Sequence, residues 1–193
     1  MEQRNQMDQT VCLRRRERRP PATIKSALSE IAPSRSSDCI EVWYDGCCEP
    51  VNPGGNAACG IVIKRGGQVL WQESRYIGSG PAMSNNVAEY GGMIAALEYL
   101  IEKGLTHFPV VLHGDSMLSV RQMTGEWRIK GGRYLPYYLK AKELARQFSD
   151  ITFLWIPREE NAEADTLSKA VLKEQGIRFR IQKEENGVGG RRP

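Results

Sequence analysis

The sequence has few of the features that mark membrane and secreted proteins. No run of apolar residues approaches the roughly 18 that a membrane-spanning helix needs. The N-terminal segment MEQRNQMDQT lacks the apolar stretch of a secretory signal. The pattern of a transit peptide is interrupted by four acids, Glu2, Asp8, Glu17 and Glu30. We therefore expect an intracellular, cytoplasmic protein with no membrane contact.

Cysteine is also sparse, and its spacing argues against two common uses. Five cysteines leave one unpaired in any complete disulfide scheme, and no paired CxxC spacing for zinc is present. Reduced thiols in a reducing compartment explain this usage better than a disulfide framework. The cysteines are Cys12, Cys39, Cys47, Cys48 and Cys59.

The N-terminal segment has no aromatic residue before Trp43. Residues 1–37 hold eight Arg or Lys and four Asp or Glu, whereas residues 38–193 hold 19 of each, so the net charge of +4 lies in the first segment. Such a composition cannot bury enough apolar surface to fold alone, and we expect 1–37 to be a disordered basic tail. The run RRRERR at 14–19 has three interpretations: a solvated tail, a phosphate-attracting arm, or a nuclear or organellar localisation signal.

A folded domain is predicted at 38–173, followed by a polar, glycine-rich tail at 174–193. Gly66-Gly67 is a strong hairpin signal between two segments rich in β-formers. Ser84 has the chemistry of a helix N-cap, and Gly104 follows an apolar stripe with i, i+3, i+4 spacing. The patterns predict strands at 39–45, 57–65, 68–77, 109–114 and 150–156, and helices between Ser84 and Gly104 and at 116–123, 134–148 and 160–173.

The order of these elements, β-β-β-α-β-α-α-β-α, predicts an α/β fold. The first three strands follow one another through short turns, which gives an antiparallel meander. The later strands are reached through helices, which is typical of parallel addition to a sheet. We therefore expect a five-stranded mixed sheet, a three-stranded antiparallel meander plus parallel strands, flanked by helices.

Four acidic residues stand beside apolar segments: Asp45 in IEVWYDG, Glu89 in SNNVAEYGG, Asp115 in VVLHGDS and Asp165 in IPREENAEADTLS. A carboxylate in such a context is costly unless a cation compensates it. Taken alone, Glu89 could be an ordinary surface residue, because it lies about 100° from Tyr90, at the edge of the apolar stripe. If the four carboxylates converge, they form a hard oxygen-ligand site for magnesium or manganese, which indicates phosphodiester chemistry.

Together the segments DGCCEPVNPGG, SNNVAEYGGMIAAL, HGDSMLSVRQMTGEW and IPREENAEADTLS resemble the type 1 ribonuclease H family. They occur in the family's order, lie within residues 39–172, and each holds one of the four acids. The similarity is greatest to the compact bacterial and archaeal branch, whose last acid lies in a PRExNxxAD segment. That branch lacks the basic protrusion of longer relatives, and only a few residues separate Trp127 from the helix predicted at Tyr134.

The resemblance implies an endonuclease that hydrolyses the RNA strand of an RNA–DNA hybrid and leaves 5′-phosphate and 3′-hydroxyl ends. It implies two Mg²⁺ ions, with Mn²⁺ as the alternative. By analogy Asp45 would bridge both ions, and Asp165 would help to hold the ion that activates water. Glu89 and Asp115 would complete the ion that faces the leaving oxygen. We expect a monomer that binds the hybrid and needs no organic cofactor.

The resemblance also implies substrate contacts. Asn85-Asn86 could donate to phosphates and RNA 2′-hydroxyls, or could simply start the helix. Trp127 resembles a groove residue that meets the DNA strand, although a plain core position is the alternative. Lys130 and Arg133 would contact phosphates or be ordinary surface charges. The implied contact residues are Asn52, Ser84, Asn85, Asn86, Gln122, Trp127 and Lys130.

The chain departs from its longer relatives in two ways. Those relatives carry a histidine in a loop before the last acid, whereas this chain has only His107 and His113, for which we expect structural roles. Residues 38–173 hold 14 basic and 16 acidic residues, so we hypothesise that the run at 14–19 acts as a surrogate basic arm. Candidates for the missing histidine's role are Arg158, Glu159, Glu160 and Asn161.

Three other functions remain open. The same fold could act on double-stranded RNA, or serve as the nuclease portion of a larger replication or reverse-transcription assembly. It could also be a non-catalytic module that binds hybrids. This last alternative predicts the loss of at least one of the four acids, and all four are present.

Overall fold

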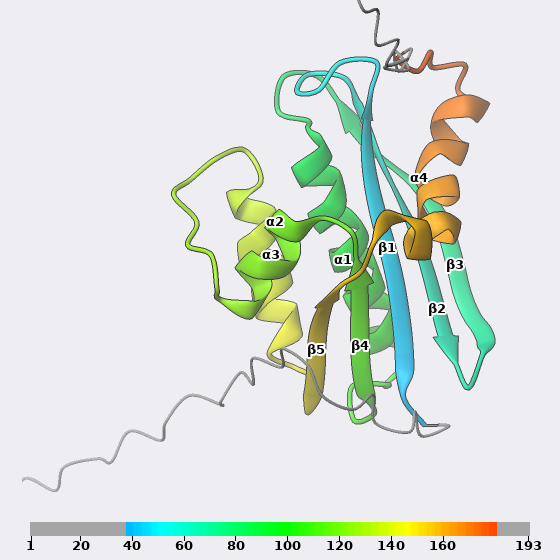
Figure 1. Ribbon diagram of the computed structural model, residues 1–193, viewed down its shortest axis with the longest axis vertical. Helices are drawn as coiled ribbons and strands as arrows, with labels where there is room; N and C mark the ends of the chain where they lie inside the picture. Colours follow the sequence, from blue (N-terminus) through cyan, green and yellow to red (C-terminus); the bar gives the residue numbers. More distant parts are fainter. Residues whose placement is uncertain (1–37, 181–193) are drawn as a thin grey trace, which may run out of the picture. The chain divides into compact units, whose positions relative to one another are not determined.

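The computed structural model describes residues 38–180, so the predicted tail at 1–37 and residues 181–193 of the tail predicted at 174–193 lie outside these residues. Within them the chain forms one sheet, four α-helices and a short 3-10 helix, η1 (Figure 1). In chain order the elements are β1 (Ile40–Glu49), β2 (Asn56–Arg65), β3 (Gln68–Ser79), α1 (Asn85–Glu102), β4 (Pro109–Gly114), α2 (Met117–Thr124), α3 (Leu135–Ala145), β5 (Asp150–Trp155), η1 (Arg158–Asn161) and α4 (Ala162–Glu174).

The sheet has the order β3-β2-β1-β4-β5. The first three strands pair antiparallel, and β4 and β5 add in parallel to β1, so the predicted mixed sheet is confirmed. β1 continues to Glu49, four residues beyond its predicted end. Gly46–Glu49 reads as a loop in the sequence, but it pairs with Asn56–Cys59 of β2, and this ladder keeps the segment extended.

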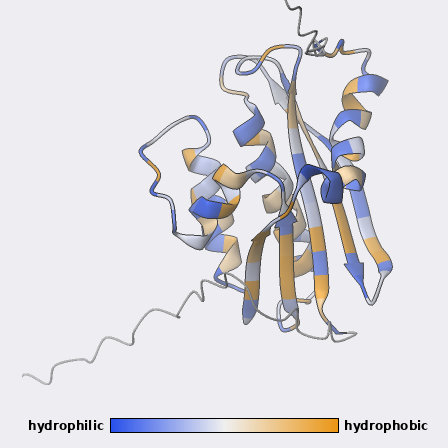
Figure 2. Cartoon of the chain, viewed as in Figure 1, coloured by the Kyte–Doolittle hydropathy of each residue, from blue (hydrophilic) through white to orange (hydrophobic). Residues whose placement is uncertain are grey.

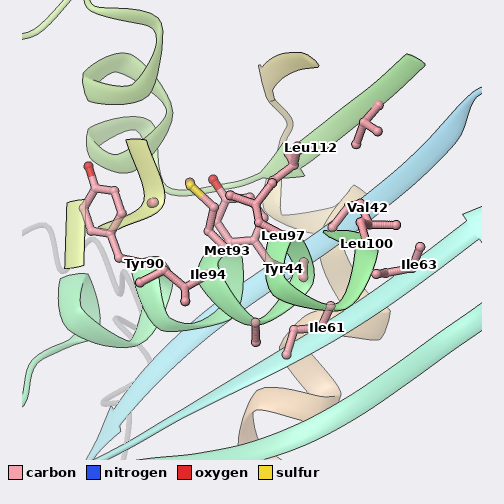
Figure 3. Close-up of a cluster of buried hydrophobic side chains, with 14 of the residues drawn as sticks. Val42, Tyr44, Ile61, Ile63, Tyr90, Met93, Ile94, Leu97, Leu100 and Leu112 are labelled. Carbon is pink, nitrogen blue, oxygen red and sulfur yellow. The ribbon is translucent and has the colours of Figure 1, made fainter. Parts of the chain in front are cut away.

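The main core lies between the sheet and α1, with α3 packed behind (Figure 3). Aliphatic and aromatic residues of α1 meet inward-facing residues of the strands, and each fully buried side chain contributes about 1.5–3 kcal/mol of transfer free energy. Hydrophobic residues accordingly run along the strands (Figure 2). The labelled core residues are Val42, Tyr44, Ile61, Ile63, Tyr90, Met93, Ile94, Leu97, Leu100 and Leu112.

The other face of the sheet is covered by α4, which contacts β1, β2 and β3. Successive residues of a strand point to opposite faces. Tyr44 belongs to the core beneath α1, whereas Cys47, an odd number of residues further on, packs with Ala58 and with Leu172 of α4. The sheet is therefore packed between α1 on one face and α4 on the other (Figure 1).

Within residues 38–180, Cys39, Cys47, Cys48 and Cys59 form no disulfide, and Cys12 lies outside the described residues. Among the helices of residues 38–180, none is both long and apolar enough to span a bilayer.

Candidate active site

Three of the four predicted acids meet at one edge of the sheet. Asp45 lies in β1, Glu89 in the second turn of α1, and Asp115 directly after β4. Each offers a carboxylate oxygen, and these oxygens lie within 4.8 Å of one another. β1 and β4 are adjacent parallel strands, and their register, with Trp43 beside His113, brings Asp45 in the middle of β1 beside Asp115 just after the end of β4. Ligands gather at the carboxyl ends of strands in α/β sheets. We call these three residues the acidic triad.

Two glycines allow helices to approach this edge closely. A Cβ atom on Gly46 would lie 2.2 Å from the Glu89 backbone nitrogen, so the start of α1 could not pack there against a larger residue. On the other face, a Cβ atom on Gly60 would lie 2.2 Å from the Ala164 carbonyl oxygen of α4. Gly60 is the register partner of Asp45. Because these two glycines have no side chain, the start of α1, which carries Glu89, and α4 can both pack close to Asp45.

The acidic triad is poorly compensated by the protein itself. Asp45 is 5% exposed and Glu89 is 7% exposed. Burial raises the pKa of Asp45 to about 6, and the charges of Asp115 and Asp165 add to this effect. Burial, reinforced by the charges of Asp45 and Asp115, raises the pKa of Glu89 well above its ordinary value.

The donors of the triad fit a divalent cation. Among residues 38–180 the buried Oε2 atom of Glu89 has no hydrogen-bond partner, and an unsatisfied buried oxygen is costly unless something binds it. Carboxylate oxygens are the ligands that Mg²⁺ and Mn²⁺ prefer. An ion among the three carboxylates would compensate their charge and satisfy this oxygen.

The fourth acid, Asp165, has a different environment. It lines the same pocket but is not one of the three mutually close carboxylates. Its Oδ1 accepts from Arg158 Nη2 at 2.7 Å, and its Oδ2 accepts from Lys169 Nζ at 2.5 Å. Burial alone would raise the pKa of Asp165, but the hydrogen bonds from Lys169 and Arg158 outweigh it and hold this pKa below the ordinary value. All four predicted acids therefore line one pocket, and two cations hold the fourth.

Two side chains from the β5–α4 region support Asp115. Asn161 is fully buried, and its Nδ2 donates to the Tyr44 carbonyl at 2.9 Å and to Asp115 Oδ1 at 3.4 Å. Trp155 Nε1 donates to the Asp115 carbonyl at 3.0 Å. These contacts also explain why the predicted helix at 160–173 is preceded by η1: the chain turns to bury Asn161 before α4 begins.

The acids open into a pocket whose lining is almost entirely polar. It includes the predicted contacts Asn85 and Asn86 and the predicted auxiliary residue Arg158. The buried Oδ1 atom of Asn85 has no hydrogen-bond partner in the part of the chain that the structure describes. The lining residues are Asp45, Gly46, Cys47, Glu49, Asn85, Asn86, Glu89, Asp115, Ser116, Arg158, Asp165, Lys169 and Arg180.

Two predicted substrate contacts shape the start of α1 and do not line the pocket. Ser84 is the N-cap, and its Oγ accepts from the Val87 backbone nitrogen at 3.3 Å. Asn52, in the β1–β2 loop, accepts from the Asn85 backbone nitrogen at 3.0 Å through Oδ1. Both satisfy backbone N–H groups that the first turn of a helix leaves unpaired. They therefore position Asn85 and Asn86 on the rim.

Gln122 differs from its predicted role as a groove residue. It is 4% exposed, accepts from the Tyr90 hydroxyl at 2.7 Å and donates to the Tyr134 hydroxyl at 3.3 Å. Its amide therefore joins α1, α2 and the start of α3, a contact that sequence spacing does not reveal.

The remaining predicted residues lie on the surface. Trp127 is 46% exposed, so a plain core position is wrong. It lies with the exposed residues Lys130 and Arg133 in the segment between α2 and α3. Glu159 and Glu160 are exposed in η1 and do not line the pocket.

Several lining residues were not identified from the sequence. Lys169 follows Asp165 by four residues, a spacing that places both on one helix face and could have revealed the ion pair. Ser116 also carries a sequence signal, because it is the serine that caps the start of α2. Glu49 and Arg180 carried no such signal, because they come together only through the tertiary path of the chain after α4.

Comparison with known proteins agrees with this geometry. A family model described as reverse transcriptase-like matches residues 43–171. The "Bifunctional protein Rv2228c" of Mycobacterium tuberculosis is 42% identical over 89 residues, which is 46% of this chain and 24% of that protein. The chain thus spans about a quarter of the length of that relative.

Solved structures cover more of the fold. RNase H1 from the archaeon Halobacterium salinarum NRC-1 is 31% identical with a TM-score of 0.63, and the match covers 70% of this chain and 98% of that one. LC11-RNase H1, solved in complex with an RNA/DNA hybrid, is 34% identical with a TM-score of 0.64, and the match again covers 70% and 98%. With a family model matching most of the described domain and an RNase H1 matched over nearly its whole length, the chain belongs to the type 1 ribonuclease H family.

Proposed function

We propose that this protein is a divalent-metal-dependent endonuclease that hydrolyses the RNA strand of RNA–DNA hybrids. The acidic triad carries the proposal: three carboxylate oxygens lie within 4.8 Å of one another, and a buried oxygen of Glu89 lacks a partner. The relationship to RNase H1 structures supports the substrate class, and one of those structures was solved with a hybrid bound.

The proposed cofactors are two Mg²⁺ ions, or Mn²⁺ in their place. Asp45 would hold both, because its carboxylate lies close to that of Asp115 and lines the same pocket as Asp165. Glu89 and Asp115 would complete one ion position and Asp165 the other. When bound, such a pair supplies Lewis acidity to the attacking and leaving oxygens of an in-line displacement.

The remaining chemistry belongs to the protein's own residues. Water oxygen bonds to phosphorus as the bond to the 3′ oxygen breaks, and that oxygen takes a proton, so the products carry a 5′-phosphate and a 3′-hydroxyl. Asn161 and Trp155 keep Asp115 in place throughout. Arg158 and Lys169 hold Asp165 beside the attacked phosphate, where they also offset the charge of the substrate.

Asn85 supplies a means of selecting RNA. Asn85 lines the pocket, and its buried side-chain oxygen has no hydrogen-bond partner among the described residues. A ribose 2′-hydroxyl can donate to such an acceptor, and deoxyribose cannot. Asn86, beside it on the rim, can donate to a phosphate oxygen.

The test compares four labelled duplexes, namely RNA–DNA hybrid, duplex RNA, duplex DNA and DNA with one ribonucleotide, in Mg²⁺, Mn²⁺ or chelator. We expect cleavage of the hybrid only with metal, and none by Glu89→Gln. Glu143→Gln, which removes an exposed carboxylate on α3, is the matched control and retains activity. Binding of the hybrid without cleavage would identify a non-catalytic module, and preferential cleavage of duplex RNA would reassign the substrate.

A further inference from the structure

We propose that Arg180, in the segment that follows α4, binds a backbone phosphate of the nucleic acid at the rim of the pocket. This inference rests on the proposed function, because it names a further substrate contact of the same site. Three cations line the pocket: Arg158, Lys169 and Arg180. The first two are hydrogen-bonded to Asp165. Of the described residues, Arg180 is therefore the lining cation that has no hydrogen bond to a proposed metal ligand.

The segment that carries Arg180 is fixed to the domain. After α4, the backbone nitrogen of Ile177 donates to the Leu172 carbonyl at 2.9 Å, and Gly176 takes the left-handed conformation (φ 69°) that such a helix end requires. Ile177 and Phe179 then pack against the cluster of Cys47, Ala58 and Leu172. Residues 177–180 alternate between half-buried and exposed, so the apolar side chains anchor the segment while the arginines face outward.

The contacts of Arg180 fix its backbone but leave its guanidinium accessible. Its backbone nitrogen donates to Glu49 Oε2 at 3.0 Å, which fixes the position of the residue. The guanidinium contacts are longer: 3.3 Å from Nε to Glu49 Oε2, 3.4 Å from Nη2 to the Cys48 carbonyl, and 3.5 Å from Nη2 to Glu49 Oε1. The side chain remains 48% exposed. Donors at these distances bond weakly and can turn to a phosphate, which arginine binds through its planar fork.

The charge of the pocket favours this role. Its lining carries five carboxylates and three cations, a formal charge of −2, which repels a polyanion. Two divalent ions would change this charge to +2. Residues 38–173 have no excess of basic residues, 14 against 16 acidic, so each cation at the rim matters for affinity. The half-exposed side chain of Arg180 at the rim could therefore contact a phosphate next to the one that is cleaved.

The experiment measures hybrid binding as a function of salt in the Asp45→Asn background, which we expect not to cleave. Arg180→Gln should weaken binding about tenfold, the effect of losing a charge-assisted contact. It should also reduce the slope of log affinity against log salt by about 0.7–0.9, the change for one lost phosphate contact. Arg180→Lys should retain most of the slope, because the charge stays. Arg178→Gln is the matched control, since Arg178 is exposed, lies two residues away and does not line the pocket, and its slope should be unchanged.

A second variant separates phosphate binding from simple anchoring. If Arg180 only tied the segment to Glu49, then Glu49→Gln would weaken hybrid binding as much as Arg180→Gln does. If Arg180 binds phosphate, Glu49→Gln releases the guanidinium, removes a negative charge from the rim, and leaves binding unchanged or stronger. Equal weakening by both variants, or equal slopes for Arg180→Gln and Arg178→Gln, would overturn the inference. If the Asp45→Asn protein did not bind the hybrid and the unmodified protein did not cleave it, the proposed function itself would be overturned.

Discussion

The acidic triad and Asp165 share one pocket, yet their electrostatic environments are opposite. Asp45 and Glu89 are buried, lie beside other carboxylates, and have raised pKa values. Asp165 is held by Arg158 and Lys169, and its pKa is lowered. Among residues 38–180, two cations form ion pairs with Asp165, whereas no Lys or Arg forms an ion pair with a residue of the acidic triad.

This difference suggests an order of metal binding. A divalent ion among the triad relieves repulsion and satisfies Glu89 Oε2. A divalent ion beside Asp165 must compete with the Lys169 ammonium and the Arg158 guanidinium for the same oxygens. We expect the triad to bind its ion more tightly, and the Asp165 position to fill at higher metal concentration or together with the substrate. The predictions below test this contrast.

The largest effect is expected from Asp45→Asn. Loss of a carboxylate that holds both proposed ions should lower kcat for hybrid cleavage about 1,000-fold or more, since metal assistance supplies several kcal/mol and each 1.36 kcal/mol is a factor of ten in rate. The fold should remain intact, because asparagine has nearly the same shape. Steady-state cleavage in Mg²⁺, with circular dichroism as the control for folding, measures both. Full activity of this variant would remove the metal site from the mechanism.

The next effect concerns stability without metal. The folded-state pKa of Asp45, about 6, exceeds the unfolded value of about 3.9, so its contribution to stability is fully present below about pH 4 and is lost as pH rises to about 6. The difference corresponds to at most about 3 kcal/mol, and Glu89 acts in the same direction. Mg²⁺ removes this cost, so it should raise the Tm more at about pH 7.5 than at about pH 5.

Thermal unfolding with and without Mg²⁺ at both pH values measures that difference. Asp150→Asn, which removes an exposed carboxylate at the start of β5, should respond to Mg²⁺ as the unmodified protein does. An equal rise in Tm at both pH values would mean that the triad does not provide the dominant metal site.

Asp165→Asn should have the opposite effect on the metal-free protein. It abolishes two ion pairs whose members are partly exposed, and such pairs contribute up to about 1 kcal/mol each. We expect a decrease of about 1–2 kcal/mol in the free energy of unfolding, whereas Asp45→Asn without metal should increase it. Denaturant titrations of both variants in chelator measure the sign of the change in the free energy of unfolding. The same sign for both would contradict the division of the pocket into two halves.

The smallest effect is expected from Lys169→Gln. This change removes the ammonium that occupies Asp165 Oδ2 but leaves Arg158 in place. Binding of Mn²⁺ to the Asp165 position should tighten by about fivefold or less, the equivalent of up to about 1 kcal/mol. Calorimetric titration of the metal-free protein measures it, with Lys142→Gln on α3 as the control away from the pocket. Weaker binding would show that Lys169 helps to shape the ion position.

The sequence predicts the secondary structure and the triad well, because each depends on local signals. Gly66-Gly67 marks the hairpin, Ser84 caps α1, and the acids of the triad stand beside apolar segments. The outcome for Glu89 is instructive: the helical pattern placed it at the border of the apolar face, and the absence of a side chain at Gly46 is what buries it. That close approach depends on a contact between distant segments, which the local pattern does not contain.

Other features depend on such contacts entirely. Gln122 reads as a polar residue free to meet the substrate, but two tyrosines from other elements take both ends of its amide. Arg180 falls in what reads as a polar tail, and Ile177 and Phe179 are too few for a periodic signal. The hypothesis that the basic run at 14–19 serves as an arm lies outside the described residues and stays a prediction.

The hydrogen bond from the Trp155 indole to the Asp115 carbonyl has a practical consequence. This ring is 40% exposed and is tied to the backbone of a proposed ligand, so its emission spectrum should respond when that ligand is occupied. A titration could then be followed optically without any label, and Trp155→Phe would identify the signal among the four tryptophans of the chain. Trp155 would then serve as an intrinsic fluorescent reporter of ion binding at Asp115.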